Sequence, residues 1–204
     1  FCDSASFRKV ESVAKSILIQ VFTSQFDRGH YEDVGRALRQ RFPTACLIGT
    51  TSGGEILKGQ VSFGKTVVSV SFFARTEVHQ TFLEKEESTE NGAAPPVPSD
   101  DHKLGQRLAE QLARPSTKAM ILIGCPGPID IGQMLDGVFA SRPDLLVSGG
   151  SAACTMTGGT PMVFDGEHVS DHGLCGVGLS GDDLEVNHYW HLSWHSIGKV
   201  MTVT

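Results

Sequence analysis

The sequence predicts an α/β fold made of two duplicated β-α-β-hairpin repeats, with mixed sheets flanked by helices in α-β-β-α layers. Two observations predict this fold. Continuous apolar runs, typical of strands buried on both faces, alternate with segments whose apolar residues recur at helical spacing. The same order of elements then occurs twice, at about residues 16–85 and 118–195. An internal duplication is the simplest explanation of that order.

The first repeat contains two buried strands around one helix, followed by an antiparallel pair of strands. These elements are expected, in chain order, at residues 16–24, 31–42, 45–50, 65–74 and 77–84. Val34, Leu38 and Phe42 form the apolar stripe of the helix, and Pro43 ends it. The last two segments alternate apolar and polar residues, which is typical of antiparallel strands.

An acidic, proline-rich segment at residues 86–101 has no apolar periodicity and predicts a flexible connector. After it, a helix is expected at 101–114, and the second repeat then follows the order of the first. Its elements are expected as a strand at 118–125, a helix at 131–143, a strand at 144–150, and hairpin strands within 160–181 and 183–194. Residues 1–15 precede the repeats. Because the chain starts without Met and has no signal peptide, we interpret this end as the edge of a truncated chain.

Each repeat has a loop of small residues at the end of its second buried strand. The runs GTTSGGE and SGGSAAC are equivalent, with Gly49 corresponding roughly to Gly149, and the Asp-x-Gly of Asp27 matches that of Asp130. Open α/β sheets bind ligands at such strand ends. The predicted ligand-binding residues are Thr50, Thr51, Ser52, Gly53, Glu55, Gly150 and Ser151.

The first loop does not match two other kinds of functional loop. A phosphate cradle needs a longer glycine-rich run with a lysine at fixed spacing, and a nucleophile elbow needs Ser in a G-x-S-x-G frame. The sequence offers neither. A plain tight turn remains the alternative to a ligand rim. Asp27 and Asp130 are expected to be helix N-caps or turn residues.

Composition excludes several classes of function. The formal charge is −6 and no block of Lys and Arg occurs, so a nucleic-acid partner is not expected. No apolar run approaches the roughly 20 residues that span a bilayer, so no membrane partner is expected either. Five widely spaced cysteines without a CxxC pair indicate core residues in a reducing compartment, and hence a cytoplasmic protein without a structural metal site. No nucleophile–base pair is recognisable, so we do not expect an enzyme.

Five segments together resemble the N-terminal half of a FIST domain, a bacterial sensory module also found in F-box proteins. They are IGTTSGGEI, VVSVSFFARTEV, VSGGSAA, FDGEHVSDHGLCGVGLSG and WHSIGKVMTVT. The resemblance covers residues 16–200 and implies that 201–204 begin an absent C-terminal FIST half. It further implies a sensor of a small ligand, coupled to an absent output domain or partner such as a kinase or cyclic-di-GMP enzyme.

The sequence is most similar to the haem-binding, nitric-oxide-sensing branch of these signalling proteins. Haem is therefore the expected cofactor, and the residues predicted to bind it are His188, His191, His195 and Trp190 of the run NHYWHLSWH. Histidine is a common haem ligand, and flat aromatic rings suit a porphyrin. The alternatives left open are an aromatic edge with no cofactor, a sensor of a small polar metabolite such as an amino acid, and a protein-interaction scaffold without ligand.

Overall fold

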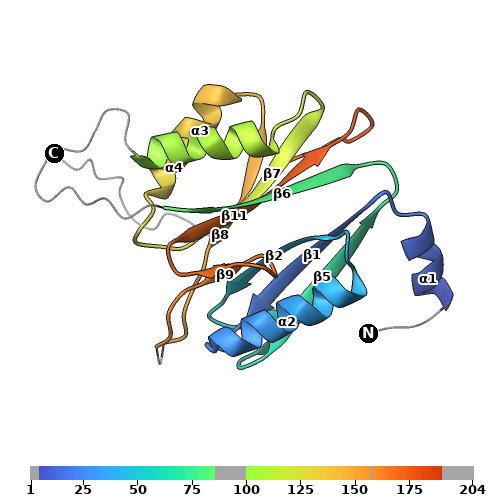
Figure 1. Cartoon of the computed structure of the whole chain (residues 1–204), viewed down its shortest axis with the longest axis vertical. Coiled ribbons are helices and arrows are strands. Elements are labelled where there is room, and N and C mark those ends of the chain that lie inside the picture. Colours follow the sequence, from blue (N-terminus) through green and yellow to red (C-terminus); the bar gives the residue numbers. More distant parts are fainter. Residues whose placement is uncertain (1–4, 86–99, 157, 190–204) are drawn as a thin grey trace, which may run out of the picture.

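The protein is a stack of two β-sheets between two layers of helices (Figure 1). The computed structural model describes residues 5–85, 100–156 and 158–189. In Figure 1, α3 and α4 cover one side of the stack and α2 covers the other. The predicted α/β class with mixed sheets flanked by helices is confirmed.

The first sheet is mixed and has the strand order β10-β9-β2-β1-β5. Its strands are β1 (Ser16–Thr23), β2 (Cys46–Thr51), β5 (Thr66–Phe73), β9 (Val163–Phe164) and β10 (Val169–Ser170). β1 and β2 are parallel, and β5 is antiparallel to β1. Helix α2 (Arg28–Arg41) packs on its outer face, and α1 (Ala5–Ser12) precedes β1.

The second sheet has the order β6-β11-β7-β8. Its strands are β6 (Glu77–Glu84), β7 (Thr117–Gly124), β8 (Leu146–Ser151) and β11 (Gly173–Ser180). Helices α3 (Asp100–Leu112) and α4 (Ile131–Ser141) pack together on its outer face. A separate two-stranded hairpin is formed by β3 (Glu55–Leu57) and β4 (Gln60–Ser62).

Three buried clusters hold the layers together. One lies between α2 and the first sheet, one between the two sheets, and one between the second sheet and the α3–α4 pair. Cys125 and Cys175 belong to the cluster between the sheets, as expected for core cysteines. Burial raises the pKa of both thiols, which keeps them protonated at neutral pH.

Both helices that follow the first strand of a repeat are capped by the predicted aspartates. The Asp27 side chain accepts a hydrogen bond from the Gly29 amide at the start of α2. The Asp130 side chain accepts one from the Gln133 amide at the start of α4. The N-cap interpretation is confirmed for both residues.

Two strand predictions are wrong. β5 and β6 do not pair as a hairpin: β5 pairs with β1, whereas β6 pairs with β11 in the other sheet. β6 is buried from both faces there, because Val78 packs between the sheets and Leu83 packs against the α3–α4 cluster. A strand was also expected at residues 183–194, but residues 183–189 form no strand, and the rest lie outside the described residues. Their alternating pattern finds no backbone partner among the described strands.

Candidate functional site

The loops that end β2 and β8 lie side by side, as their equivalence suggested. The Ala153 amide donates a hydrogen bond to the Thr51 carbonyl oxygen at 3.0 Å. Gly53 also lies close to the second loop, since a Cβ atom added to Gly53 would be 3.4 Å from the Cys154 carbonyl oxygen. The two small-residue loops therefore form one continuous surface at the carboxyl ends of β2 and β8.

The polar groups of the β2 loop are largely used within the protein. Thr51 exchanges two hydrogen bonds with the Met162 backbone, each 2.9 Å long, one through its amide and one through its hydroxyl oxygen. The Thr50 hydroxyl is buried and donates to the Thr51 carbonyl oxygen. Gly53 is the exposed member of this loop. The ligand-binding assignment of this loop stays a prediction, and these bonds give its threonines a structural role.

Glu55 is a buried carboxylate at the base of the same loop, with 2% of its surface exposed. The Ser52 hydroxyl donates to its Oε1 at 2.7 Å, and the Ser24 hydroxyl donates to its Oε2 at 2.8 Å. Ser24 in turn accepts a hydrogen bond from the Gly64 amide. Glu55 therefore connects the start of β3 to the segment after β1 and, through Ser24, to the turn before β5.

Replacing Glu55 with alanine is expected to lower the free energy of unfolding by about 1–3 kcal/mol, because the buried Ser24 hydroxyl and the half-buried Ser52 hydroxyl lose their acceptor. Urea denaturation followed by circular dichroism measures this change. Glu32→Ala, on the exposed side of α2, is the matched control and should stay within about 0.5 kcal/mol of the wild type. Equal stabilities of the two variants would show that the Glu55 carboxylate is not a structural anchor.

The β8 loop borders an open cavity of about 340 Å³, which we call the α4–β8 cavity. Gly150 and Ser151 lie on its rim, and both are exposed. The exposed side chain of His188 lines the same cavity. Two separate sequence predictions, the ligand rim and the haem histidine, thus meet at one place in the structure. The other predicted haem residues, Trp190, His191 and His195, lie outside the described residues.

The walls of the α4–β8 cavity are apolar. They are formed by Leu122, Ile131, Met134, Leu135, Phe139, Val147 and Leu174. None of these side chains was predicted to be functional. A signal for them exists, because Ile131, Leu135 and Phe139 form a second apolar stripe on α4, beside the stripe that carries Met134 and Val138. A helix that covers one core needs a single stripe, so the second indicates another apolar contact.

A larger cleft, of about 560 Å³, lies at the opposite end of the sheets, beside Lys15 and Ser116 at the amino ends of β1 and β7. Its charged groups pair with one another, as Lys15 does with Glu77 and Arg75 with Asp183. Open α/β sheets bind ligands at the carboxyl ends of their strands, so the α4–β8 cavity is the stronger candidate.

The family model described as the FIST N domain matches residues 17–204 of the chain. The chain belongs to the FIST N family. FIST domains are sensor domains of signalling proteins, so the α4–β8 cavity lies in a domain type that detects signals. A search of curated proteins found no match.

Two further observations bear on the chemistry of this FIST N domain. Within the described residues, no three His, Cys, Asp or Glu side chains gather in a way that would hold a metal ion. None of the described helices is long and apolar enough to cross a membrane.

Proposed function

We propose that this FIST N domain is a haem-based sensor of nitric oxide, with the haem bound in the α4–β8 cavity. The observation that carries the proposal is the exposed imidazole of His188 beside a cavity with apolar walls. The role is binding and signalling rather than catalysis, and the signal would pass to a FIST C-terminal half and an output kinase or cyclic-di-GMP enzyme.

The residues of the cavity fit this group in two respects. A porphyrin is flat and largely apolar, and the side chains of Ile131, Leu135 and Phe139 offer it an apolar wall along α4. Histidine is a usual ligand of haem iron, and His188, which lines the cavity, would supply the imidazole. Gly150 leaves the β8 side of the rim open, because nothing lies within 4 Å of the Cβ position of this glycine.

Haem iron supplies the binding position for nitric oxide, and the protein supplies the response. A ligand in the cavity contacts α4 on one side and β8 on the other. Because α4 packs backbone against backbone on α3, a displacement of α4 moves the α3–α4 pair as a unit. We propose that this displacement is the signal.

The test is a titration of haem into the purified protein, followed by its absorption spectrum with and without nitric oxide. A sharp Soret band at one equivalent, which moves with nitric oxide, is expected. His188→Ala should weaken haem binding about tenfold or more, equivalent to about 1.4 kcal/mol. His172→Ala, in the turn before β11, is the matched control and should bind as the wild type does. The same titration of His191→Ala and His195→Ala tests whether the other two predicted histidines contribute to haem binding.

A protein that shows no Soret band, or a His188→Ala variant that binds haem like the wild type, would contradict the assignment of His188. The polar-metabolite alternative then becomes the main hypothesis. Amino-acid binding would appear as ligand-dependent melting, with about 2.7 kcal/mol of stabilisation at a hundredfold the dissociation constant. A scaffold without ligand would show neither response.

A further inference from the structure

The α4–β8 cavity has a counterpart in the first repeat. The parallel pairs β1–β2 and β7–β8 each extend over six residues, and the two registers correspond position by position. Gly49 on β2, opposite Val21, is therefore equivalent to Gly149 on β8, opposite Leu122. The two glycines hold equivalent places in their sheets, but the Cβ position of Gly49 faces the ring of Phe164, whereas that of Gly149 faces the Leu122 backbone.

In the first repeat this place is filled by Phe164. β9 pairs antiparallel with the outer edge of β2, with Phe164 opposite Gly49 and Val163 opposite Thr50. The ring of Phe164 stacks on Tyr31, with 5.2 Å between ring centroids and 4° between planes. A Cβ added to Gly49 would lie 2.1 Å from a ring carbon of Phe164, so only glycine allows this approach. We call this arrangement the Phe164 site.

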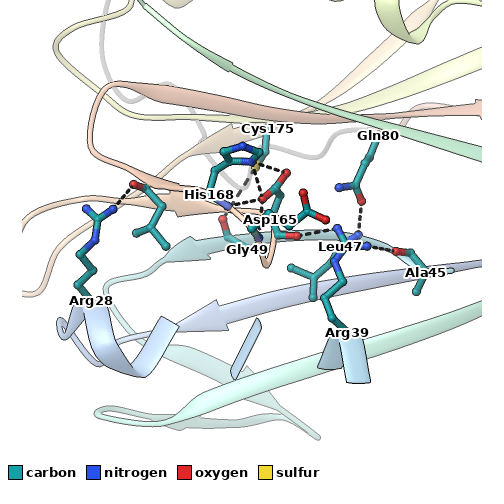
Figure 2. Close-up of polar contacts among 11 residues, drawn as sticks. Arg28, Arg39, Ala45, Leu47, Gly49, Gln80, Asp165, His168 and Cys175 are labelled. Carbon is teal, nitrogen blue, oxygen red and sulfur yellow. Dashed lines mark hydrogen bonds and ion pairs between the residues drawn. The ribbon is translucent and has the colours of Figure 1, made fainter. Parts of the chain in front are cut away.

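Helix α2 also holds the β9–β10 hairpin in place (Figure 2). The Arg28 guanidinium donates to the Val169 carbonyl oxygen at 3.0 Å, and the Arg39 guanidinium donates to the Asp165 carbonyl oxygen at 2.9 Å. A strand edge, a glycine and a helix face together bind a hairpin that comes from the other repeat.

The second repeat has an equivalent strand edge, on which the described residues place no hairpin. Met134 lies four residues after its N-cap, as Tyr31 does in α2, and it lines the cavity together with Gly149 and Leu122. β8 is the last strand of its sheet, and no described strand pairs with its outer side. An open edge beside an apolar cavity is a site for an added strand.

The chain also carries a hairpin that fits this site. The β3–β4 hairpin follows β2 in the first repeat, just as the β9–β10 hairpin follows β8 in the second. Leu57 ends its first strand, as Phe164 ends β9, and Leu57 is 54% exposed. The exposed apolar side chains of this hairpin and its flank are Ile56, Leu57, Val61 and Phe63. Such a group on a small surface is typical of an interaction site.

The β3–β4 hairpin does not pair with β8 of its own chain. Among the described strands, β3 and β4 pair only with each other. Glu55, the first residue of β3, accepts hydrogen bonds from the Ser24 and Ser52 hydroxyls, and these hold the hairpin at the end of the first sheet. With the hairpin held there, its docking on a β8 edge is a contact between two molecules.

We propose that the β3–β4 hairpin of one copy of this chain docks on the β8 edge of a second copy, with its Leu57 in the α4–β8 cavity. The register follows from the Phe164 site: Leu57 of β3 lies opposite Gly149, and Ile56 lies opposite Gly150, in an antiparallel pair. Each copy carries one hairpin and one edge, so the contact is either reciprocal in a closed dimer or continues head to tail.

The docked hairpin belongs to the protein without ligand, whatever the identity of the ligand. Because the docked Leu57 and a ligand in the α4–β8 cavity occupy the same space, each excludes the other. A sensor built in this way converts ligand binding into a change of assembly.

The test is the molecular mass of the ligand-free chain, measured by sedimentation velocity and light scattering over a range of concentrations. The wild-type mass is expected to rise with concentration to at least twice that of the monomer. Leu57→Glu places a charge on the hairpin, and Phe139→Glu places one in the cavity wall, where Phe139 is 39% exposed. Each variant alone should stay a monomer. Val13→Glu, an exposed apolar position after α1, is the matched control and should assemble like the wild type.

Mixing the two variants distinguishes this contact from any other. The Leu57→Glu chain keeps a working edge and the Phe139→Glu chain keeps a working hairpin, so an equimolar mixture should regain a species of twice the monomer mass. A wild type that is monomeric at every concentration would overturn the proposal, and so would an assembly that both variants retain. A mixture that stays monomeric although both variants are folded would also overturn it. Haem titration of the monomeric Leu57→Glu variant tests the proposed ligand separately, so the two proposals can fail independently.

Discussion

Replacing Phe164 with alanine is expected to lower the free energy of unfolding by about 3–5 kcal/mol. The ring is almost fully buried and stacked on Tyr31, and it also covers the outer edge of β2 at Gly49. Its loss opens a cavity beneath α2 and removes the apolar anchor of the β9–β10 hairpin. Because a whole domain is stabilised by about 5–15 kcal/mol, this single change consumes a large share of the total.

Equilibrium urea denaturation measures this loss, and hydrogen exchange locates it. The amides of β2 should exchange faster in Phe164→Ala, because β9 no longer covers that edge. Phe63→Ala is the matched control, since Phe63 is 68% exposed, and its stability should change by less than about 0.5 kcal/mol. A loss below about 1 kcal/mol for Phe164→Ala would show that the hairpin is held mainly by the arginine contacts of α2.

The second large effect is expected at Gly137, where α4 crosses α3. A Cβ added there would lie 2.0 Å from the His102 carbonyl oxygen, and one added to Gly105 on α3 would lie 1.9 Å from the Met134 carbonyl oxygen. The two helices therefore touch backbone to backbone. Alanine favours a helix over glycine by about 1 kcal/mol, but neither backbone can turn away from the added methyl group. We expect Gly137→Ala to destabilise the protein by about 3 kcal/mol, because the helices must separate.

Gly150→Ala is the matched control for this prediction, since nothing lies within 4 Å of its Cβ position. Its stability should remain close to that of the wild type, whereas Gly137→Ala should melt about 2–4 °C lower for each kcal/mol lost, the shift expected for a chain of 204 residues. Displacing α4 also changes the wall of the α4–β8 cavity, so Gly137→Ala should alter haem affinity at temperatures where it is still folded. A Gly137→Ala variant as stable as the wild type would show that α3 and α4 can move apart without a loss of stability.

Local patterns in the sequence determined much of the secondary structure. Continuous apolar runs predicted the strands β1, β2 and β7. A strand that is buried on both faces is apolar throughout and does not alternate with polar residues. The aspartates before α2 and α4 marked the helix starts, because capping depends on residues within one turn. The equivalence of Gly49 and Gly149 was also visible, because duplication preserves spacing.

Tertiary structure alone decided which strands pair and which side chains meet. β6 alternates like a hairpin partner of β5, yet it pairs with β11, because backbone hydrogen bonds are the same with any strand and burial selects the partner. The buried carboxylate of Glu55 accepts a hydrogen bond from Ser24, more than 30 residues earlier in the chain. His188 likewise lies at the β8 rim although it is distant from β8 in sequence. Contacts between such distant residues leave no local pattern in the sequence. β9 likewise pairs with β2 of the other repeat, whereas β3 pairs with β4, and no local pattern distinguishes the two hairpins, because the burial of Phe164 against α2 and β2 exists only in the folded chain.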